Sequence, residues 1–437
     1  MFYDNFCKMN IPSIVAPGWS HQKAVVASAY WAEEVYLWVP FTSLRMRQNK
    51  LYNFEDLKST IDQLHTQWTK AFLTMNIFPR NKDIQIFESI TEKIANCWAD
   101  SIIFSDPGTF RIIRKYLPDI PLHLSTQTTT LNSDSVKFWA DLWVKRIVLA
   151  RELHISEIEE IKKAVPEMEL EAFIHGAMCM TYSGRCLLWD YLWGRPANKW
   201  ECNHSCRFQY KVFIQEARRE WKMLEVTEDE NGEHIFSSRD LCTIDHLNEL
   251  LPILDAMKIE WRSKSEFYVA ATVKAYKHVR DCILQWKSIN KNIKNLVEMI
   301  PHRSYRDWFL FHNLQEFPDW EISPDEMKTT EDNIITTTKW TAWPLFNRNF
   351  FGILSTDIKE KNWNIYHHID PKEELRRWMK LNFISPNDIW ILEINDILDK
   401  NWKQIDKADC NMKDIYISTD HSLNWRECLY LPPDQLK

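Results

Sequence analysis

The chain has 437 residues and a formal net charge of −7 at pH 7. This length suffices for two or three domains, although a single α/β barrel already takes about 250 residues. The negative charge argues against bulk, non-specific binding of nucleic acid. The N-terminus has no basic segment followed by an apolar one, and no apolar run approaches the roughly 18 residues that span a bilayer. We therefore expect a cytoplasmic protein that does not enter a membrane.

Residues 12–290 alternate short apolar strands with amphipathic helices, the pattern of an α/β protein with a parallel sheet. Eight strand–helix units favour a (β/α)8 TIM-like barrel over residues 1–305, with an open doubly wound sheet as the alternative. The expected strands cover residues 12–17, 35–39, 71–77, 101–106, 121–127, 146–152, 169–176 and 256–262.

The sequence changes character after the predicted barrel. Residues 306–334 are acidic and contain proline, which predicts a linker. Residues 335–437 contain the short apolar segments FFGILSTDI, IWILEIN, DIYIST and ECLYLP, separated by turn residues. This pattern predicts a small β-barrel-like, all-β C-terminal domain.

Glycine and tryptophan occur in unusual numbers, 7 and 22 respectively. Average usage of about 7% would give roughly 30 glycines in a chain of this length. Trp31, Trp68, Trp98 and Trp143 each stand between a helical pattern and a β-branched strand, where a helix commonly ends in a left-handed glycine. Because some bacterial lineages read UGA as glycine, we expect UGA glycine recoding at many of these positions, against the alternative of a tryptophan-rich protein. Trp139 lies inside a helical pattern and should be a true tryptophan.

Polar side chains stand at the carboxyl ends of the predicted strands. In a closed barrel these ends converge on one rim, where active sites of that fold lie. Each residue taken alone can equally be a helix cap or a solvated loop residue. The set comprises Asn76, Asp106, Ser125, Gln127, Arg151, Glu152, His175, Glu260 and Arg262.

A cluster of cysteines lies in residues 177–255, a long insertion between the seventh and eighth strands. Because cytoplasmic thiols are kept reduced, such a cluster indicates a metal or cofactor site rather than disulfides. The spacing C-x6-C, x15, C-x3-C is too loose for zinc knuckles, so an iron–sulfur cluster, zinc and no metal all stay open. Cys242 is a possible substitute ligand. The cluster consists of Cys179, Cys186, Cys202 and Cys206.

Two observations guide the functional interpretation of this insertion. It leaves the barrel directly after His175, so we expect its thiols to lie over the barrel mouth. The sequence also contains no H-E-x-x-H, G-x-S-x-G, P-loop or G-x-G-x-x-G motif. His175 and Ser183 form only a weak nucleophile–base pattern.

The segment FIHGAMCMTYSGRCLLWDYLWGRPANKWECNHSCRF resembles the signature of the U32 peptidase, or collagenase-like protease, family. LHLSTQTTTLNSDSVKFW, KRIVLAREL, FSSRDLCTIDHL and KIEWRSKSEFYVA resemble that family too, and the similarity extends into the C-terminal segment. Tryptophan stands where the family usually has glycine at positions 31, 38, 68, 98, 143, 200, 221, 261 and 308. This resemblance independently supports the recoding hypothesis.

The domain arrangement is most similar to family members that take part in tRNA hydroxylation. The resemblance implies formation of 5-hydroxyuridine at the wobble position, with a 4Fe–4S cluster and with prephenate as a small anionic cosubstrate. It also implies Cys179, Cys186, Cys202 and Cys206 as cluster ligands, although some relatives use a more distant cysteine in place of Cys206. A collagenase-like peptidase, as the family name suggests, and a non-catalytic scaffold are the alternatives.

If the chain hydroxylates tRNA, the barrel mouth would receive the RNA base and the cosubstrate. The side chains expected to contact them are Gln127, Arg151, Glu152, His175, Glu260 and Arg262.

Overall fold

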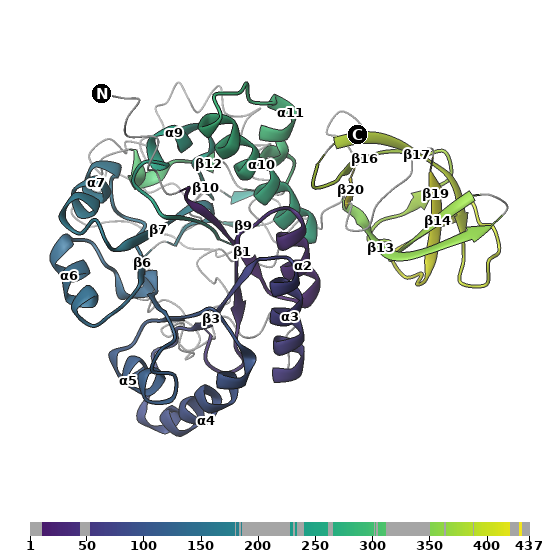
Figure 1. Ribbon diagram of the computed structural model, residues 1–437. Helices are drawn as coiled ribbons and strands as arrows, with labels where there is room; N and C mark the ends of the chain where they lie inside the picture. Colours follow the sequence, from purple (N-terminus) through teal and green to yellow (C-terminus); the bar gives the residue numbers. More distant parts are fainter. Residues whose placement is uncertain are drawn as a thin grey trace. The chain divides into compact units, whose positions relative to one another are not determined.

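The structure is a computed structural model that describes a large part of the chain (Figure 1). The described residues are 11–43, 53–179, 181–182, 185, 228–229, 232–233, 240–260, 265–300, 302, 305–311, 350–361, 364–387, 389–419 and 428–430. The chain divides into two compact units. One unit contains every strand of the parallel barrel, and the other contains helix α10 (Glu266–Leu284) and the C-terminal strands.

Eight parallel strands form the barrel of the first unit (Figure 1). Each strand pairs with the next one along the chain, and β11 pairs with both β1 and β7, which closes the sheet. The predicted (β/α)8 barrel is therefore confirmed, and the open doubly wound alternative is wrong. The strands are β1 (Ser13–Gly18), β2 (Glu34–Trp38), β3 (Lys70–Met75), β4 (Ser101–Phe104), β5 (Leu122–Leu124), β6 (Arg146–Val148), β7 (Glu169–Ala177) and β11 (Ala256–Ile259).

Helices alternate with these strands along the chain. Their starts follow from capping: the Asp106 carboxylate accepts a hydrogen bond from the Thr109 amide, and Pro107 occupies the first turn of α5. Asp106, one of the polar residues expected at the rim, is therefore a helix cap. Besides α10, the α-helices of the described residues are α2 (His21–Ala29), α3 (Phe54–Thr66), α4 (Ile84–Ile94), α5 (Pro107–Tyr116), α6 (Ser133–Asp141), α7 (Ile155–Ala164), α9 (Leu247–Leu250), α11 (Lys291–Lys294) and α12 (Leu296–Met299).

Several strands end earlier than the apolar pattern predicts. Strand β5 stops at Leu124 because the Ser125 hydroxyl accepts a hydrogen bond from the Gln127 amide and starts a 3-10 turn, η4 (Thr126–Thr128). Strand β6 stops at Val148, and the chain leaves the sheet before Arg151. The expected strands over 121–127 and 146–152 were therefore too long, and their last residues form the rim instead.

Tryptophans occupy the left-handed helix ends that the sequence predicts. The backbone φ is 76° at Trp31, 60° at Trp68, 58° at Trp98 and 61° at Trp143. A residue with a Cβ atom in this conformation costs about 1–2 kcal/mol, which is why glycine is usual there. The side chain of Trp68 is 95% exposed, so packing offsets none of that cost.

Other tryptophans divide into two groups. Trp286, Trp378 and Trp402 also have φ between 55° and 64°. Trp139, by contrast, lies inside α6, is buried, and packs its ring against Phe104 with centroids 5.5 Å apart. Its setting is that of an ordinary core residue.

Two short strands extend the sheet at the edge of β7: β10 from the insertion after β7, and β12 from the segment that follows the last barrel strand. Strand β10 (Asp240–Cys242) pairs antiparallel with the last residues of β7, and β12 (Tyr305–Arg306) pairs parallel with β10. Most of the insertion, including residues 186–227, lies outside the described residues.

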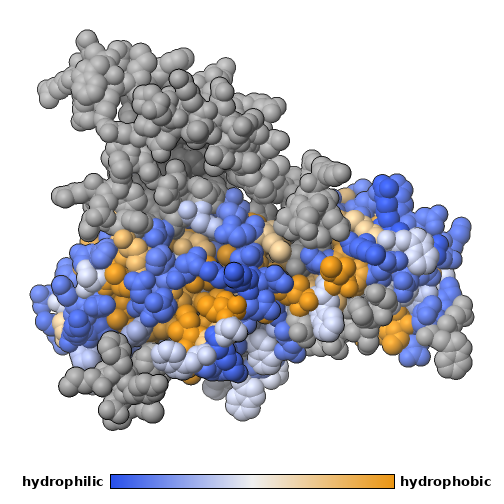
Figure 2. Space-filling model, turned by 90° about the horizontal axis from the view of Figure 1, so that it is seen from above, coloured by the Kyte–Doolittle hydropathy of each residue, from blue (hydrophilic) through white to orange (hydrophobic). Residues whose placement is uncertain are grey.

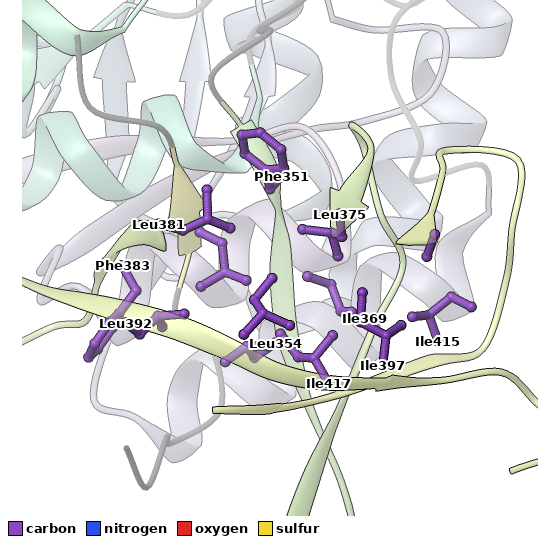
Figure 3. Packing of buried hydrophobic residues seen from close by; sticks show 13 residues of the cluster. Phe351, Leu354, Ile369, Leu375, Leu381, Phe383, Leu392, Ile397, Ile415 and Ile417 are labelled. Atoms are coloured by element: carbon purple, nitrogen blue, oxygen red, sulfur yellow. The ribbon is translucent and has the colours of Figure 1, made fainter. Parts of the chain in front are cut away.

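The second unit contains a closed antiparallel barrel of six strands in the order β13-β14-β19-β17-β16-β20. Thirteen buried residues, among them Leu354, Ile369 and Ile417, form its core (Figure 3). The predicted all-β C-terminal domain is confirmed, although β14 and β16 were missed. Since residues 312–349 lie outside the described part, the predicted 306–334 linker remains a prediction. The strands are β13 (Phe350–Lys361), β14 (Asn364–Ile369), β16 (Lys380–Ile384), β17 (Ile389–Leu398), β19 (Ile415–Thr419) and β20 (Cys428–Tyr430).

Hydrophilic and apolar side chains are interspersed on the described surface seen in Figure 2. Such a mixture is normal, because folded proteins cannot cover themselves with polar atoms alone. Within the described ranges, no helix combines the length and the apolar character of a transmembrane span.

Candidate functional site

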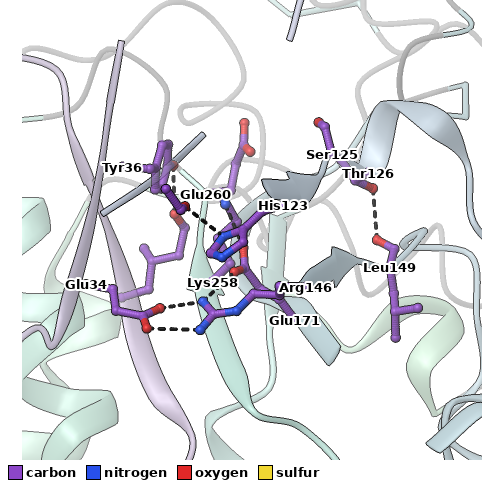
Figure 4. A network of polar contacts seen from close by, with 12 residues as sticks. Glu34, Tyr36, His123, Ser125, Thr126, Arg146, Leu149, Glu171, Lys258 and Glu260 are labelled. Atoms are coloured by element: carbon purple, nitrogen blue, oxygen red, sulfur yellow. Dashed lines mark hydrogen bonds and ion pairs between the residues drawn. The ribbon is translucent and has the colours of Figure 1, made fainter. Parts of the chain in front are cut away.

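A cluster of paired charges fills the amino-terminal half of the barrel; we call it the floor. Arg146 is its centre, donating from Nη2 to Glu34 at 3.0 Å and from Nη1 to Glu171 at 3.1 Å (Figure 4). Lys258 donates to the other Glu171 oxygen at 2.6 Å. His123, the fifth member, lies 3.2 Å from the Ser101 hydroxyl. All five floor residues are buried.

Pairing and burial together set the protonation states of the floor. Burial alone would raise the pKa of Glu171, but Lys258 and Arg146 outweigh it, and the pKa is lowered. Burial, followed by the charges of Arg146 and Lys258, holds the pKa of His123 well below its ordinary value. Glu171 is therefore ionised and His123 neutral, and the charged groups of the floor are paired with one another.

The carboxyl ends of the strands form the opposite end of the barrel, which we call the mouth. Gln127, in turn η4, is 3% exposed. Its Oε1 accepts hydrogen bonds from the hydroxyls of Ser105 at 3.2 Å and Ser125 at 3.3 Å. Its Nε2 has no partner among the described residues.

Arg151 follows β6 and bridges to the far side of the mouth. Its Nη2 donates to Glu260 Oε2 at 2.9 Å, and its Nη1 donates to the Ala177 carbonyl at 2.7 Å. The guanidinium carbon lies 3.9 Å from the centroid of the Phe173 ring, a cation–π distance. The Nε atom has no partner in the described part of the chain.

Gly176 fixes the position of Glu260. Its φ is +108°, and a Cβ atom there would lie 2.5 Å from the Glu260 carbonyl oxygen. Only glycine therefore allows β7 to approach the segment that carries the partner of Arg151.

Glu152 lies beside Arg151 and is half-buried. Burial raises the pKa of its carboxyl group, against the lowering effect of backbone hydrogen bonds and of the Arg151 charge. Its Oε2 atom has no hydrogen-bond partner among the described residues.

His175 lies near the end of β7 and is 1% exposed. Its Nε2 is 3.4 Å from the hydroxyl oxygen of Tyr305, whose ring stacks on His302 with centroids 3.8 Å apart. The His175 carbonyl accepts from the Glu260 amide at 2.8 Å, so both residues belong to one edge of the mouth.

Two of the candidate cysteines are described, and both lie near His175. Cys179 follows β7 by two residues, and Cys242 pairs with His175 across the β7–β10 ladder. Each thiol is half-buried. Among the described residues, no three side chains of the types that bind metals come together.

Four sequence-predicted site residues lie outside the described part of the chain: Arg262, Cys186, Cys202 and Cys206. The structure brings Arg151, Glu260 and His175 together at the mouth, with Gln127 and Glu152 on the neighbouring segments.

Sequence reasoning missed the floor and Tyr305. Charged residues inside otherwise apolar strands, such as Glu34 and Arg146, were a readable signal for the floor. No comparable signal marks Tyr305, because its contact with His175 spans 130 residues of sequence.

Comparisons with known proteins identify the family of the chain. The model of Peptidase family U32 matches residues 19–317. The chain is 33% identical to tRNA hydroxylation protein P of Escherichia coli, over 71% of this chain and 77% of that protein. It is 39% identical to tRNA hydroxylation protein P of Helicobacter pylori J99, over 62% of this chain and 64% of that protein. A 23S rRNA 5-hydroxycytidine synthase of Escherichia coli is 29% identical over 59% of this chain and 38% of its own length.

Proposed function

The chain belongs to peptidase family U32, and on that premise we propose that it takes part in converting a tRNA uridine to 5-hydroxyuridine at the wobble position. Relatives at 33% and 39% identity are named for tRNA hydroxylation. The observation that carries the proposal is the barrel mouth, where buried polar atoms of Gln127 and Arg151 have no hydrogen-bond partner among the residues that the structure describes. Such atoms mark a place for a polar ligand.

The mouth residues have the chemistry that an RNA base needs. A base enters a protein pocket only after leaving its stack, and it is then held by edge hydrogen bonds and by stacking. Gln127 and Arg151 supply fixed donors, and Glu260 holds the Arg151 guanidinium in place. His175, within 3.4 Å of the Tyr305 hydroxyl, is the imidazole at the mouth that can take up or release a proton during the reaction.

The chain is further proposed to hold a 4Fe–4S cluster on Cys179, Cys186, Cys202 and either Cys206 or Cys242. Thiolates are the ligands that such clusters require. The described thiols fit this role, since Cys179 and Cys242 both lie beside the end of β7 and neither is engaged in a disulfide. When bound, the cluster would supply a one-electron redox centre.

Prephenate is the proposed source of the hydroxyl group. Support for it comes from the family resemblance alone.

The left-handed tryptophans support a second proposal, UGA glycine recoding. Seven of them have positive φ, and six of these seven side chains are more than half exposed. The ring centroids of Trp19 and Trp38 lie 3.4 Å apart, below the 4.5–7 Å usual for aromatic pairs, and glycine at either position removes the crowding. Reading the gene decides: UGG codons at Trp31, Trp68, Trp98 and Trp143 would end the proposal.

Nucleoside analysis tests the hydroxylation proposal. We expect tRNA from a strain that lacks the gene to lose 5-hydroxyuridine, and the wild-type gene to restore it. Unchanged 5-hydroxyuridine would refute the proposal and leave the peptidase or scaffold alternatives. Anaerobic purification tests the cluster: a brown protein that loses its colour in a Cys179→Ala variant is expected, whereas a colourless, zinc-containing protein would exclude it.

A further inference from the structure

The unpaired atoms at the mouth form a definite set. Three are Gln127 Nε2, Arg151 Nε and Glu152 Oε2, and a fourth, the Thr130 hydroxyl, can either donate or accept; none has a hydrogen-bond partner among the described residues. Proteins rarely leave buried polar atoms unpaired. The three atoms of fixed hydrogen-bonding character therefore point to a polar ligand at this end of the barrel.

Neighbouring hydrogen bonds determine which of these atoms donate. Asn76 Nδ2 donates to the Ser125 hydroxyl at 3.4 Å, so that hydroxyl donates onward to Gln127 Oε1. The amide orientation of Gln127 is thereby set, with Nε2 as a donor that has no partner among the described residues. Each terminal nitrogen of Arg151 is engaged through one of its two N–H groups, and Nε–H is the donor of the third nitrogen, which has no partner in the described chain.

The three atoms belong to two adjacent segments. The Thr126 hydroxyl donates to the Leu149 carbonyl at 2.9 Å (Figure 4), and the Ala150 amide donates to the Thr130 carbonyl at 3.2 Å. These bonds join the segment after β5, which carries Gln127, to the segment after β6, which carries Arg151 and Glu152.

Charge decides what kind of ligand fits. Arg151 contributes +1, and Glu152 and Glu260 contribute −1 each, so these described groups sum to −1. Because the Arg151 charge is already paired with Glu260, these described groups offer no unpaired cation beside Glu152. A neutral ring with two acceptors and one donor needs none.

The edge of uracil has that pattern, since O4 and O2 accept hydrogen bonds and N3–H donates one between them. Cytosine differs at two of the three positions, because its N4 group donates and its N3 accepts. A site that offers two donors and one carboxylate oxygen matches uracil and mismatches cytosine.

We propose that Gln127 and Arg151 bind the two carbonyl oxygens of the target uracil and that Glu152 accepts from its N3–H, which makes the mouth selective for uridine over cytidine. This inference rests on the proposed function. The inference bears on a difference among the relatives, one of which is named for tRNA hydroxylation and another for 5-hydroxycytidine synthesis on 23S rRNA.

The test exchanges a donor and an acceptor of the mouth while the net charge of the protein stays the same. In a Gln127→Glu, Glu152→Gln double variant, an acceptor faces the cytosine amino group and a donor faces its N3. Binding of two RNA hairpins that differ only in uridine or cytidine at the target position is titrated with the full-length protein. We expect the parent to prefer the uridine hairpin by about tenfold or more, and the double variant to lose or reverse that preference.

Controls distinguish a loss of uridine selectivity from a loss of folding and from a loss of the hydroxylation reaction. The exposed exchanges Gln85→Glu and Glu160→Gln should leave the ratio of affinities unchanged. Should the double variant fold poorly, Glu152→Gln alone, which keeps the shape of the side chain, should still lower the ratio by about tenfold. A parent that does not distinguish the hairpins, or variants that keep the parental ratio, would overturn the inference. Loss of 5-hydroxyuridine on gene deletion, which tests the proposed function, is independent of that ratio.

Discussion

The two ends of the barrel bury charged groups in opposite ways. At the floor, Arg146 and Lys258 are paired with Glu34 and Glu171, and both Glu171 oxygens have partners. At the mouth, Arg151 is paired with Glu260 on one side only, and its Nε has no partner in the described chain. The contrast indicates that the floor stabilises the fold, whereas the mouth has polar atoms available to bind a ligand.

Breaking the floor should have the largest effect on stability. Glu171→Gln leaves Lys258 and Arg146 buried beside a neutral group, and removing one partner of a buried ion pair typically costs about 3–5 kcal/mol. Urea unfolding measures the loss. Glu169→Gln, at a side chain 24% exposed that also pairs with Arg146, is the matched control and should cost less. Equal losses would contradict the assignment of the floor.

Changing the mouth should affect function more than stability. Gln127→Met removes the unpaired amide nitrogen and also the oxygen that accepts from the buried Ser105 and Ser125 hydroxyls, so we expect the free energy of unfolding to fall by about 1–3 kcal/mol. Binding of the target RNA should weaken about tenfold, as measured by titration. A variant that is strongly destabilised would show that Gln127 is a structural residue.

The floor should also make the protein sensitive to acid. His123 is neutral in the fold because its pKa is held low, whereas the unfolded chain takes up a proton at about pH 6.5. Stability is therefore complete above about pH 6.5 and falls below it, by at most about 1.4 kcal/mol per pH unit. Glu171, whose pKa is lowered, adds a further loss once the pH falls below about 4.3.

Unfolding measured across pH tests this dependence. His123→Gln should flatten the slope between about pH 6.5 and pH 5, where no other floor residue is expected to titrate. A slope that persists in the variant would assign the effect to a different group.

The smallest expected effect concerns a tryptophan that belongs to neither the floor nor the mouth. Trp68→Gly relieves a left-handed backbone at an exposed helix end and should raise the free energy of unfolding by about 1 kcal/mol. Trp139→Gly is the opposing control, since it empties a buried site in α6 and should cost about 3–5 kcal/mol. Thermal unfolding compares the two, and a loss of stability in Trp68→Gly would contradict the helix-end argument.

The sequence was informative where local chemistry determines structure. Strand–helix alternation predicted the barrel. Tryptophans at positions where glycine is usual, such as Trp98, identified helix ends whose φ is positive. Local patterns could not predict which charged residues pair across the barrel. Arg146 and Glu34 are 112 residues apart in the sequence, and neither strand's sequence identifies the other residue as its partner.

The candidate site was predictable in the same limited sense. Position at a strand end was enough to select Arg151, Glu260 and His175 for the mouth. It was not enough to tell that Asp106 would cap a helix or that Gln127 would have an unpaired nitrogen, because both depend on hydrogen bonds to neighbouring segments.

The most direct test of the central claim, that the unpaired mouth is where RNA is held for hydroxylation, is quantification of 5-hydroxyuridine in tRNA from a deletion strain that carries either the wild-type gene or Gln127→Met. The account predicts that the wild-type gene restores the nucleoside and that the variant, though folded and present at the same level, does not. Full restoration by the variant would contradict it.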